Sequence, residues 1–186
     1  MITTFKSKFD LIKYFAELNF TKGAEIGVAE GYFSEAMFKT IPNLELFCVD
    51  SWEVYKNNRW AGSEERNIHH RNTTKERLSK YNAGIIEEFS MDAVQQFDDG
   101  ELDFVYIDAN HSFDYVMQDL IEWSKKVRKG GIVALDDYYD FKGAGVIEAV
   151  DAYCKAHGIT PNFTDPYTDK IQDRGSQEQA NAWWIK

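Results

Sequence analysis

The sequence predicts a single α/β domain with a doubly wound, mostly parallel sheet and helices on both of its faces. Strand-like apolar segments alternate with segments of helical periodicity, an order that is typical of parallel sheets. Acidic residues stand at the ends of most strand segments, which is where ligands bind in open α/β sheets. The chain has 186 residues without a repeat, linker or low-complexity tract, so we expect residues 1–186 to form one domain.

The N-terminal segment, residues 1–22, is expected to contain a helix at 7–20. Ser7, with Asp10 three residues later, resembles the capping box that starts many helices. Apolar side chains then recur at the spacing of one helical face, namely Leu11, Ile12, Phe15 and Leu18.

The next elements are expected to be a strand at 24–28, a helix at 32–40 and a strand at 44–50. Both strands are short apolar runs, as in a sheet that is buried on both faces. The tripeptide Ile41-Pro42-Asn43 ends the helix between them, because proline cannot continue a helix.

Residues 51–82 interrupt this alternation. They are polar, aromatic and basic, with helical turns but few residues that could enter a core. We therefore interpret this segment as a lid or insertion over the binding site. Its two adjacent histidines, His69 and His70, could reach the substrate, but a place on the solvated face of the lid is the simpler expectation.

The alternation resumes in the second half of the chain. The helix predicted at 112–129 is clearly amphipathic, and Gly130-Gly131 is expected to end it through a left-handed cap. The other expected elements are strands at 84–89, 103–108, 132–137, 161–165 and 182–186 and helices at 90–97 and 144–157.

The composition excludes several classes of protein. The formal net charge of −10 argues against nucleic acid as a partner, because phosphate binding needs a basic surface. We expect no membrane partner, because no apolar run approaches the length of a spanning helix, and the first residues have no secretory apolar segment. Cys48 and Cys154 have neither a disulfide nor a metal-binding pattern, which fits a cytoplasmic protein.

The strand ends form the candidate site. Glu25 and Gly27 end the first strand, Asp50 the second, Phe89-Ser90 the third and Asp108 the fourth, while the fifth ends in Asp136-Asp137. In a parallel sheet these groups meet at one edge. A solvated edge would not favour acids at four ends of five, so we expect a functional site here.

Three stretches of the sequence resemble class I methyltransferases that use S-adenosylmethionine. "EIGVAEGYFS" (25–34) resembles their glycine loop and "LFCVDSW" (46–52) their second-strand acid. "FVYIDANHSFDYVMQDLIEWSKKVRKGGIVALDDY" (104–138) is similar to their fourth and fifth strands. The resemblance spans residues 23 to about 140 and is greatest for the catechol-type and antibiotic-sugar-type O-methyltransferases, many of which use a divalent metal. It implies a seven-stranded Rossmann-like sheet.

The resemblance implies S-adenosylmethionine as the cofactor. This molecule has no pyrophosphate, so the third glycine of dinucleotide-binding loops is unnecessary, and Gly27 and Gly31 let the backbone pass close to it. Asp50 is placed to accept both ribose hydroxyls. Glu25 either contacts the amino end of the cofactor or braces the loop. Ser90 is the candidate for adenine.

The resemblance also implies a divalent cation, most simply Mg²⁺, on Asp108, Asp136 and Asp137. Three carboxylates at neighbouring strand ends repel one another unless a cation compensates them, and oxygen ligands suit Mg²⁺, Ca²⁺ or Mn²⁺. His111 is the candidate base, because its unshifted pKa lies near neutrality. In the alternative, Asp108 orders the amino group of the cofactor and the Asp136-Asp137 pair caps the following helix.

The function expected from these features is methyl transfer to a hydroxyl of a small molecule, either a sugar or a catechol-like ring. Three alternatives remain open. These are a nucleoside-binding module without catalysis, a metal-independent methyltransferase and an oxygenase-like enzyme on the same fold. The sequence identifies neither the acceptor nor the oligomeric state.

Overall fold

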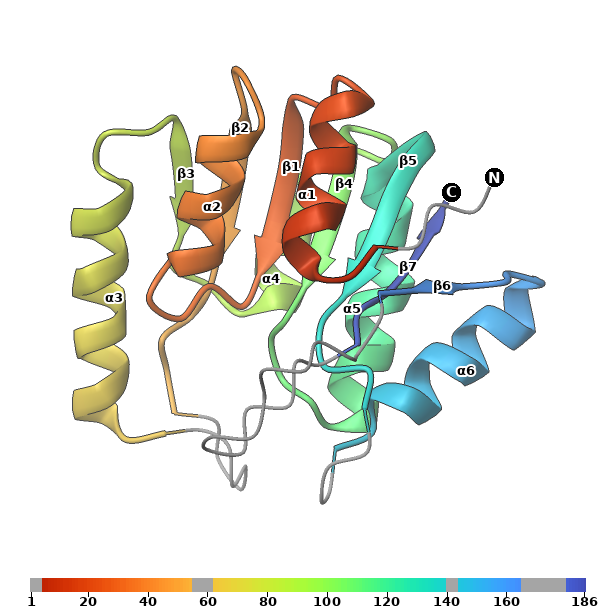
Figure 1. Cartoon of the computed structure of the whole chain (residues 1–186). Helices are drawn as coiled ribbons and strands as arrows, with labels where there is room; N and C mark the ends of the chain where they lie inside the picture. The colour runs from red at the N-terminus through yellow and green to blue at the C-terminus, as the bar shows by residue number, and fades with distance from the viewer. Residues whose placement is uncertain (1–4, 55–61, 140–143, 165–179) are drawn as a thin grey trace.

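The computed structural model describes residues 5–54, 62–139, 144–164 and 180–186 as a seven-stranded sheet between two layers of helices (Figure 1). The strand order is β3-β2-β1-β4-β5-β7-β6. Strands β1 to β5 pair in parallel, while β7 runs antiparallel to both β5 and β6. The predicted doubly wound, mostly parallel sheet is therefore confirmed.

Strands and helices alternate along most of the chain. The strands are β1 (Lys22–Ile26), β2 (Glu45–Val49), β3 (Ala83–Ile86), β4 (Leu102–Ile107), β5 (Val127–Leu135), β6 (Asn162–Phe163) and β7 (Ala182–Ile185). The helices are α1 (Lys8–Glu17), α2 (Tyr32–Thr40), α3 (Glu64–Leu78), α4 (Ser90–Ala93), α5 (Phe113–Lys126) and α6 (Val146–His157), and a 3-10 turn, η1 (Val94–Gln96), follows α4.

The register of the parallel strands brings their carboxyl ends to one edge of the sheet. Ile26 of β1 lies opposite Val49 of β2 and Ile107 of β4, and Ile107 lies opposite Leu135 of β5. The residues that follow these positions therefore start from the same level of the sheet, and they are Gly27, Asp50, Asp108 and Asp136.

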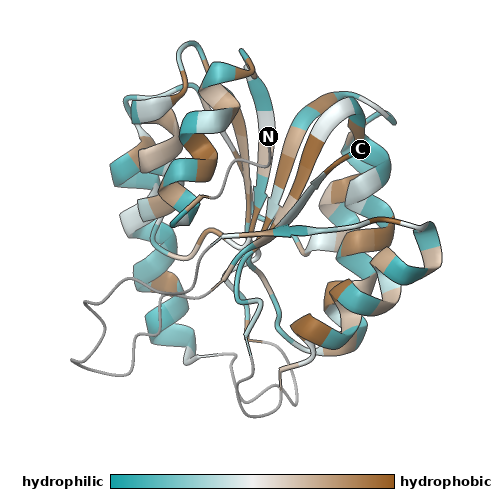
Figure 2. Ribbon diagram, turned by 45° about the vertical axis from the view of Figure 1, so that its right-hand side comes forward, coloured by the Kyte–Doolittle hydropathy of each residue, from teal (hydrophilic) through white to brown (hydrophobic). Residues whose placement is uncertain are grey.

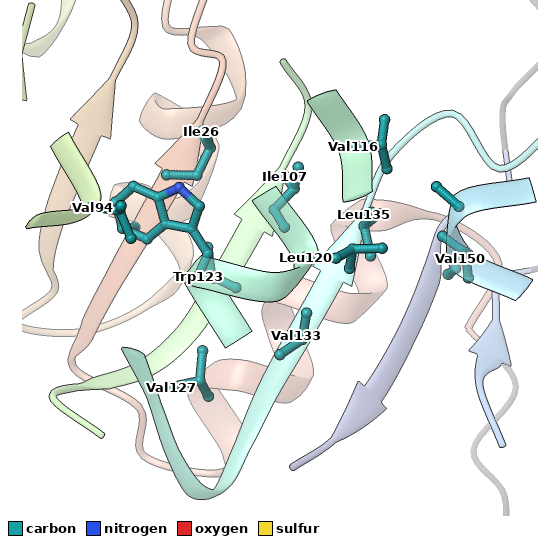
Figure 3. Close-up of a cluster of buried hydrophobic side chains, with 14 of the residues drawn as sticks. Ile26, Val94, Ile107, Val116, Leu120, Trp123, Val127, Val133, Leu135 and Val150 are labelled. Carbon is teal, nitrogen blue, oxygen red and sulfur yellow. The ribbon is translucent and has the colours of Figure 1, made fainter. Parts of the chain in front are cut away.

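Each face of the sheet has its own hydrophobic core. Helices α1, α2 and α3 cover one face, and α4, α5 and α6 cover the other (Figure 1). Trp123 of α5 is fully buried in the second core, next to Val94 and the side chains of β1, β4 and β5 (Figure 3). The strands are largely apolar and the hydrophilic residues lie mainly on the outer surfaces of the helices (Figure 2), as expected for a sheet buried on both faces.

Gly130 and Gly131 do not cap a helix. Helix α5 is followed directly by Val127, which already has extended backbone angles, and both glycines lie inside β5. The pairing of β4 with β5 shifts between Leu102 and Phe104 at this point, and Gly130 has φ +78°. The glycines therefore serve an irregularity of the strand, and the predicted C-terminal cap is wrong.

The start of α1 also differs from the predicted capping box. Ser7 occupies the N-cap position, but its side chain makes no capping hydrogen bond. The carboxylate of Asp10 accepts the backbone N–H of Lys6 at 3.2 Å. This N–H belongs to the residue before the N-cap and not to Ser7 itself, so the structure shows neither bond of the predicted reciprocal pair among the described residues.

Residues 64–78 form one continuous helix, α3, where the sequence predicted only helical turns. Its N-cap Ser63 accepts the backbone N–H of Arg66 at 3.2 Å. Thr74 and Leu78 are its buried residues, and both lie next to Gly31 at the start of α2. Residues 55–61 of the predicted lid lie outside the described part of the chain.

Within the described ranges, no helix is both long enough and apolar enough to cross a membrane.

Candidate functional site

A cavity of about 540 Å³ opens at the carboxyl ends of the strands. It extends from the start of α1, across the ends of β1, β2 and β4, to the first turns of α3. Six of the predicted site residues line it, namely Glu25, Gly27, Asp50, Ser90, Asp108 and His111. The other three, Gly31, Asp136 and Asp137, are not among its lining residues.

Gly27 stands where β1 and β4 come into closest contact. Its φ is +90°, and a Cβ at this position would lie 2.0 Å from the carbonyl oxygen of Asp108. Its backbone N–H donates to the carbonyl of Val49 at 2.8 Å. No other residue type fits this conformation and this space. Glycine therefore allows the residue after β1 to pack directly against the Asp108 peptide at the base of the cavity.

Gly31 performs a different task at the start of α2. It is the N-cap residue with φ +72°, and a Cβ here would come within 3.2 Å of the side chain of Thr74. The glycine lets α3 pack directly on the loop between β1 and α2. We call residues 27–31 the glycine loop.

Asp50 holds the glycine loop from the side of β2. Its Oδ2 accepts the backbone N–H groups of Val28 and Ala29, both at 3.0 Å, and its Oδ1 accepts the N–H of Trp52 at 2.8 Å. A carboxylate offers about four acceptor positions, and the chain occupies three of them. About one position remains for a ligand, and the acceptance of ribose hydroxyls by Asp50 stays a prediction.

A second set of contacts holds the carbonyl groups of the glycine loop. The Ala29 carbonyl accepts Trp52 Nε1 at 2.9 Å and Thr74 Oγ1 at 2.8 Å. The Glu30 carbonyl accepts Arg77 Nε at 2.9 Å, and the Arg77 guanidinium lies 3.5 Å from the centre of the Tyr32 ring. Ala29 has φ +49°, an unusual conformation for a residue with a side chain, and these bonds keep it in place.

Glu25 is buried below the glycine loop and accepts a short hydrogen bond from the hydroxyl of Ser34 in α2. Burial raises the pKa of Glu25 to about 8, although the Ser34 hydroxyl and the ammonium of Lys8 act in the opposite direction. Both predicted roles of Glu25 remain compatible with the structure, since it braces the loop and also lines the cavity.

Ser90 lies at the start of α4, and its hydroxyl is engaged inside the protein. It donates a short hydrogen bond to Asp119 and accepts Trp123 Nε1 at 2.7 Å. Burial raises the pKa of Asp119 to about 7, although the Ser90 hydroxyl works against this shift. The hydroxyl therefore belongs to the packing of α5, and any contact of Ser90 with adenine falls to its backbone.

The ends of β4 and β5 form an acidic corner. Ligand atoms of Asp108, His111 and Asp137 lie within 4.8 Å of one another. His111 Nε2 is 2.7 Å from Asp137 Oδ2 and 3.6 Å from Asp108 Oδ1. We call these three residues the carboxylate corner.

The third predicted metal ligand, Asp136, is engaged elsewhere. Its Oδ2 forms an ion pair with Lys8 Nζ at 2.5 Å. The predicted set of Asp108, Asp136 and Asp137 is thus replaced by one in which His111 stands in the place of Asp136. The sequence suggested His111 as the catalytic base. In the structure its imidazole lies next to the carboxylates of Asp108 and Asp137.

Two buried polar atoms at the corner lack a hydrogen-bond partner among the described residues. They are Asp137 Oδ1 and Asn110 Nδ2, and the Asp137 and Asn110 side chains belong to residues that are 7% and 6% exposed. Such atoms are rare in folded proteins and commonly mark a ligand or ion. An orphaned carboxylate oxygen beside an imidazole fits a divalent cation, and Asn110 also lines the cavity.

The charges of the corner are strongly coupled. Burial and the negative charge of Asp136 raise the pKa of Asp108 to about 7, against the hydrogen bond from His111. Burial lowers the pKa of His111, but Asp108 and Asp137 outweigh it and bring the value to about 10. His111 is therefore held as an imidazolium in this arrangement, so it donates protons rather than accepting them.

Sequence reasoning missed several residues of the site. Lys8 reaches it from α1, and Trp52, Thr74 and Arg77 hold the glycine loop. The helical spacing of Lys8 with the apolar residues of α1 was a usable signal, because a lysine on an apolar face requires a partner. The contacts of α3 depend on its packing and had no sequence signal.

Arg66, Asn67 and His70 of α3 line the outer part of the cavity. His70 Nε2 lies 3.4 Å from Arg66 Nε and 3.3 Å from Glu30 Oε1. Burial and the charge of Arg66 lower the pKa of His70. His70 thus lines the cavity. The simpler expectation from the sequence had been a place on the solvated face of this segment.

Most of the site described above lies within a region that matches a known protein family. Residues 24–138 match a family described as a methyltransferase domain. No curated protein matches the chain closely enough to count as a relative. At the identities of the solved structures given below, structural likeness is informative about the fold alone.

Three solved structures illustrate this likeness. The O-methyltransferase TomG from Streptomyces achromogenes, involved in tomaymycin synthesis and solved in complex with SAM, has a TM-score of 0.62 at 18% identity over 96% of this chain and 79% of its own. An O-methyltransferase from Bacillus cereus in complex with SAH has a TM-score of 0.65 at 13% identity over 96% and 80%. The O-methyltransferase NovP has a TM-score of 0.64 at 17% identity over 96% and 79%.

Proposed function

The chain belongs to the methyltransferase-domain family, and from that premise we propose that it transfers a methyl group from S-adenosylmethionine to a hydroxyl of a small molecule. The observation that carries the proposal is the division of one cavity into two chemically different ends. The glycine loop forms one end, where most of the backbone groups of residues 27–31 are hydrogen-bonded within the protein. The carboxylate corner forms the other, where acids and an imidazolium gather. A donor and a hydroxyl acceptor need these two environments.

The glycine loop would hold the donor. Gly27 leaves room for the methionine part above the β1–β4 contact, and Asp50 has an acceptor position left for one ribose hydroxyl. Glu25 lies below the loop and lines the cavity, so its carboxyl group would offer a hydrogen-bond acceptor to the amino group of the cofactor. Binding of SAM or SAH by two of the structural neighbours supports this choice of cofactor.

The carboxylate corner would orient and deprotonate the acceptor. Methyl transfer is an in-line displacement, so the protein mainly supplies geometry and a proton acceptor. The pKa of Asp108, raised to about 7 by burial and by Asp136, matches the range in which general bases work at neutral pH. His111 would donate a hydrogen bond to Asp108 or to the acceptor oxygen and so fix its direction.

The residues of the corner also fit a divalent cation, with Mg²⁺ as the first choice. Asp108, His111 and Asp137 would hold it, with the unpartnered Asp137 Oδ1 as one ligand atom. His111 would then bind as the neutral imidazole, so binding of the ion would release its proton, and the ion would take over from Asp108 the activation of the acceptor hydroxyl. Such an ion supplies a Lewis acid that lowers the pKa of an acceptor hydroxyl. The role of His111 as the base, predicted from the sequence, would require that the charges of its two carboxylate neighbours be neutralised first.

The acceptor chemistry rests on the outer part of the cavity. Trp52 and Tyr32 supply aromatic surface there, and Arg66, Asn67 and His70 supply polar contacts. A small ring or sugar with adjacent hydroxyls fits this mixture. We propose that the first turns of α3 act as the lid that the sequence suggested.

The test is direct measurement of S-adenosylhomocysteine formation with S-adenosylmethionine and a panel of catechols and sugars, with and without a chelator. Calorimetry with S-adenosylhomocysteine, and with NAD as control, accompanies it. We expect S-adenosylhomocysteine to bind and NAD not to bind. Binding without turnover on any acceptor would instead indicate a cofactor-binding module, and turnover that resists chelation would remove the metal from the proposal.

A further inference from the structure

Lys8 lies on the apolar face of α1. Leu11, Ile12 and Phe15 follow it by three, four and seven residues and are all buried. Residues at these spacings share one face of a helix, so Lys8 is directed inward with them. The Lys8 side chain is 30% exposed, and a charge that is largely removed from solvent is costly without a partner, so we expect one inside the fold.

That partner is Asp136 at the end of β5. Lys8 Nζ lies 2.5 Å from Asp136 Oδ2, and the Asp136 side chain is 4% exposed. The ammonium also lies 4.9 Å from the centre of the Phe33 ring, a favourable position for a cation. Helix α1 thus places a fixed positive charge at the edge of the cavity.

The second oxygen of Asp136 continues the contact toward the carboxylate corner. Asp136 Oδ1 accepts the backbone N–H of Asp137 at 2.9 Å. Asp137 has φ +60°, a conformation that residues with side chains rarely adopt, and its Oδ2 lies 2.7 Å from His111 Nε2. Lys8 is thereby linked to the corner through Asp136.

We propose that Lys8 is a positioning residue that acts as the internal counter-cation of Asp136. It keeps Asp136 away from any divalent ion and holds it in the orientation that directs Asp137 toward His111. A cation at this site is then limited to Asp108, His111 and Asp137. Lys8 precedes residues 24–138, so the family match does not account for it.

The inference rests on the proposed function only in treating the carboxylate corner as a site for a cation. Its prediction concerns the affinity of the corner for a cation and does not depend on whether the protein transfers a methyl group. If the ammonium is removed, Asp136 Oδ2 loses its ion pair and becomes available to join Asp108 and Asp137 at a cation, while Oδ1 still accepts the Asp137 N–H. The corner should then gain a ligand and bind a divalent ion more tightly.

The experiment measures Mn²⁺ affinity by electron paramagnetic resonance, without cofactor or acceptor. Lys8→Met removes the charge and keeps much of the length of the side chain. Lys13→Met is the matched control, because Lys13 is an exposed lysine of the same helix that pairs only with Asp10 in the described structure. A third protein combines Lys8→Met with Asp136→Asn, which restores the local charge balance of the wild type.

We expect Lys8→Met to bind Mn²⁺ at least about tenfold more tightly than the wild type, the scale on which groups around metal ligands change affinity. Lys13→Met should bind as the wild type does, and the double variant should return close to it. Lys8→Gln asks the same question if Lys8→Met does not give a folded protein by circular dichroism.

Unchanged or weaker Mn²⁺ binding in Lys8→Met and Lys8→Gln would overturn the inference, as would a gain that persists in the double variant. If the wild type binds no Mn²⁺ but Lys8→Met does, the cation in the proposed function fails while the role of Lys8 stands. If none of the proteins binds Mn²⁺, both fail. Methyl transfer without any metal would leave the proposed reaction intact in either case.

Discussion

The glycine loop and the carboxylate corner share one cavity but differ in how completely their polar groups are satisfied. In the loop, Asp50 accepts three backbone N–H groups. The carbonyls of Ala29 and Glu30 accept hydrogen bonds from side chains of α3, and the Ala29 carbonyl also accepts one from the segment between β2 and α3. In the corner, Asp137 Oδ1 and Asn110 Nδ2 have no partner among the described residues. Like charges also lie close together there.

This difference indicates a division of labour. A loop with most of its backbone groups hydrogen-bonded is largely ordered before any ligand arrives, so it loses little entropy on binding. A corner with unpaired buried groups carries an energetic cost that a ligand can relieve. Changes in the corner should therefore alter turnover more than binding, and changes in the loop should alter donor binding and stability.

The largest effect is expected from Asp108→Asn in the corner. Loss of a proton acceptor at the reaction centre should lower the rate of methyl transfer by about 10²–10⁴-fold, while the dissociation constant of S-adenosylhomocysteine changes by less than about fivefold. Single-turnover kinetics and calorimetry measure the two quantities. The exposed Asp114→Asn in α5 is the control. An equal loss of donor affinity would break the distinction between the two regions.

The next largest effect is expected from Gly27→Ala in the loop. The added Cβ would meet the Asp108 carbonyl at 2.0 Å, in a left-handed conformation, and strain plus overpacking cost roughly 2–5 kcal/mol of unfolding free energy. Chemical denaturation measures this loss, and calorimetry the weaker donor binding.

Gly158→Ala separates strain from steric conflict. Gly158 also has a positive φ, +66°, but no atom lies within 4 Å of an added Cβ. It should lose only about 1 kcal/mol. Equal losses in the two variants would mean that the close approach of β1 and β4 has no energetic weight.

Glu25→Gln should change how stability depends on pH. Burial raises the pKa of Glu25 from 4.5 to about 8, so the folded protein binds a proton more tightly than the unfolded chain. This group's contribution is present at low pH and is lost as pH rises from about 4.5 to 8, by up to about 1.4 kcal/mol per pH unit. Glutamine should flatten this part of the profile.

The measurement compares urea denaturation of the wild type and Glu25→Gln at pH 5, 7 and 9, with the exposed Glu148→Gln as control. The difference between wild type and Glu25→Gln should grow in favour of the variant toward pH 9. A constant difference would show that Glu25 is not a buried acid, and the loop would then be less closed than its hydrogen bonds indicate.

The smallest effect is expected from Thr74→Val. Valine keeps the shape of this buried side chain but removes the hydrogen bond to the Ala29 carbonyl, which is worth about 1 kcal/mol. The dissociation constant of S-adenosylhomocysteine should rise by about fivefold, with the maximal rate unchanged. Thr73→Val makes the same change one residue earlier in α3, and an equal rise there would remove the specific role of Thr74.

Much of the site could be predicted because it depends on strand ends. Once a mostly parallel sheet is inferred, Gly27, Asp50 and Asp108 must reach one edge, and the register places them there. The clustering of His111 with Asp108 and Asp137 follows from the same edge.

The remaining features depend on packing that leaves little trace in the sequence. Lys8 meets Asp136 because the start of α1 lies beside the end of β5, and Thr74 meets Ala29 because α3 packs on the loop. Gly130-Gly131 comes shortly after a helical segment, and the sequence is the same whether these glycines cap that helix or lie at an irregularity of the next strand. Its place in β5 is decided by pairing with β4.

The contact between Gly27 and the Asp108 carbonyl also has a thermodynamic consequence. The two ends of the cavity touch at this point without room for an intervening side chain, and the Asp108 N–H is bonded to the carbonyl of Ile26 at 2.7 Å. A displacement of the loop by one ligand must therefore shift the peptide that carries Asp108. If donor and acceptor bind at these two ends as proposed, we expect their affinities to be linked through this peptide, so that each ligand changes the other's dissociation constant by the same factor.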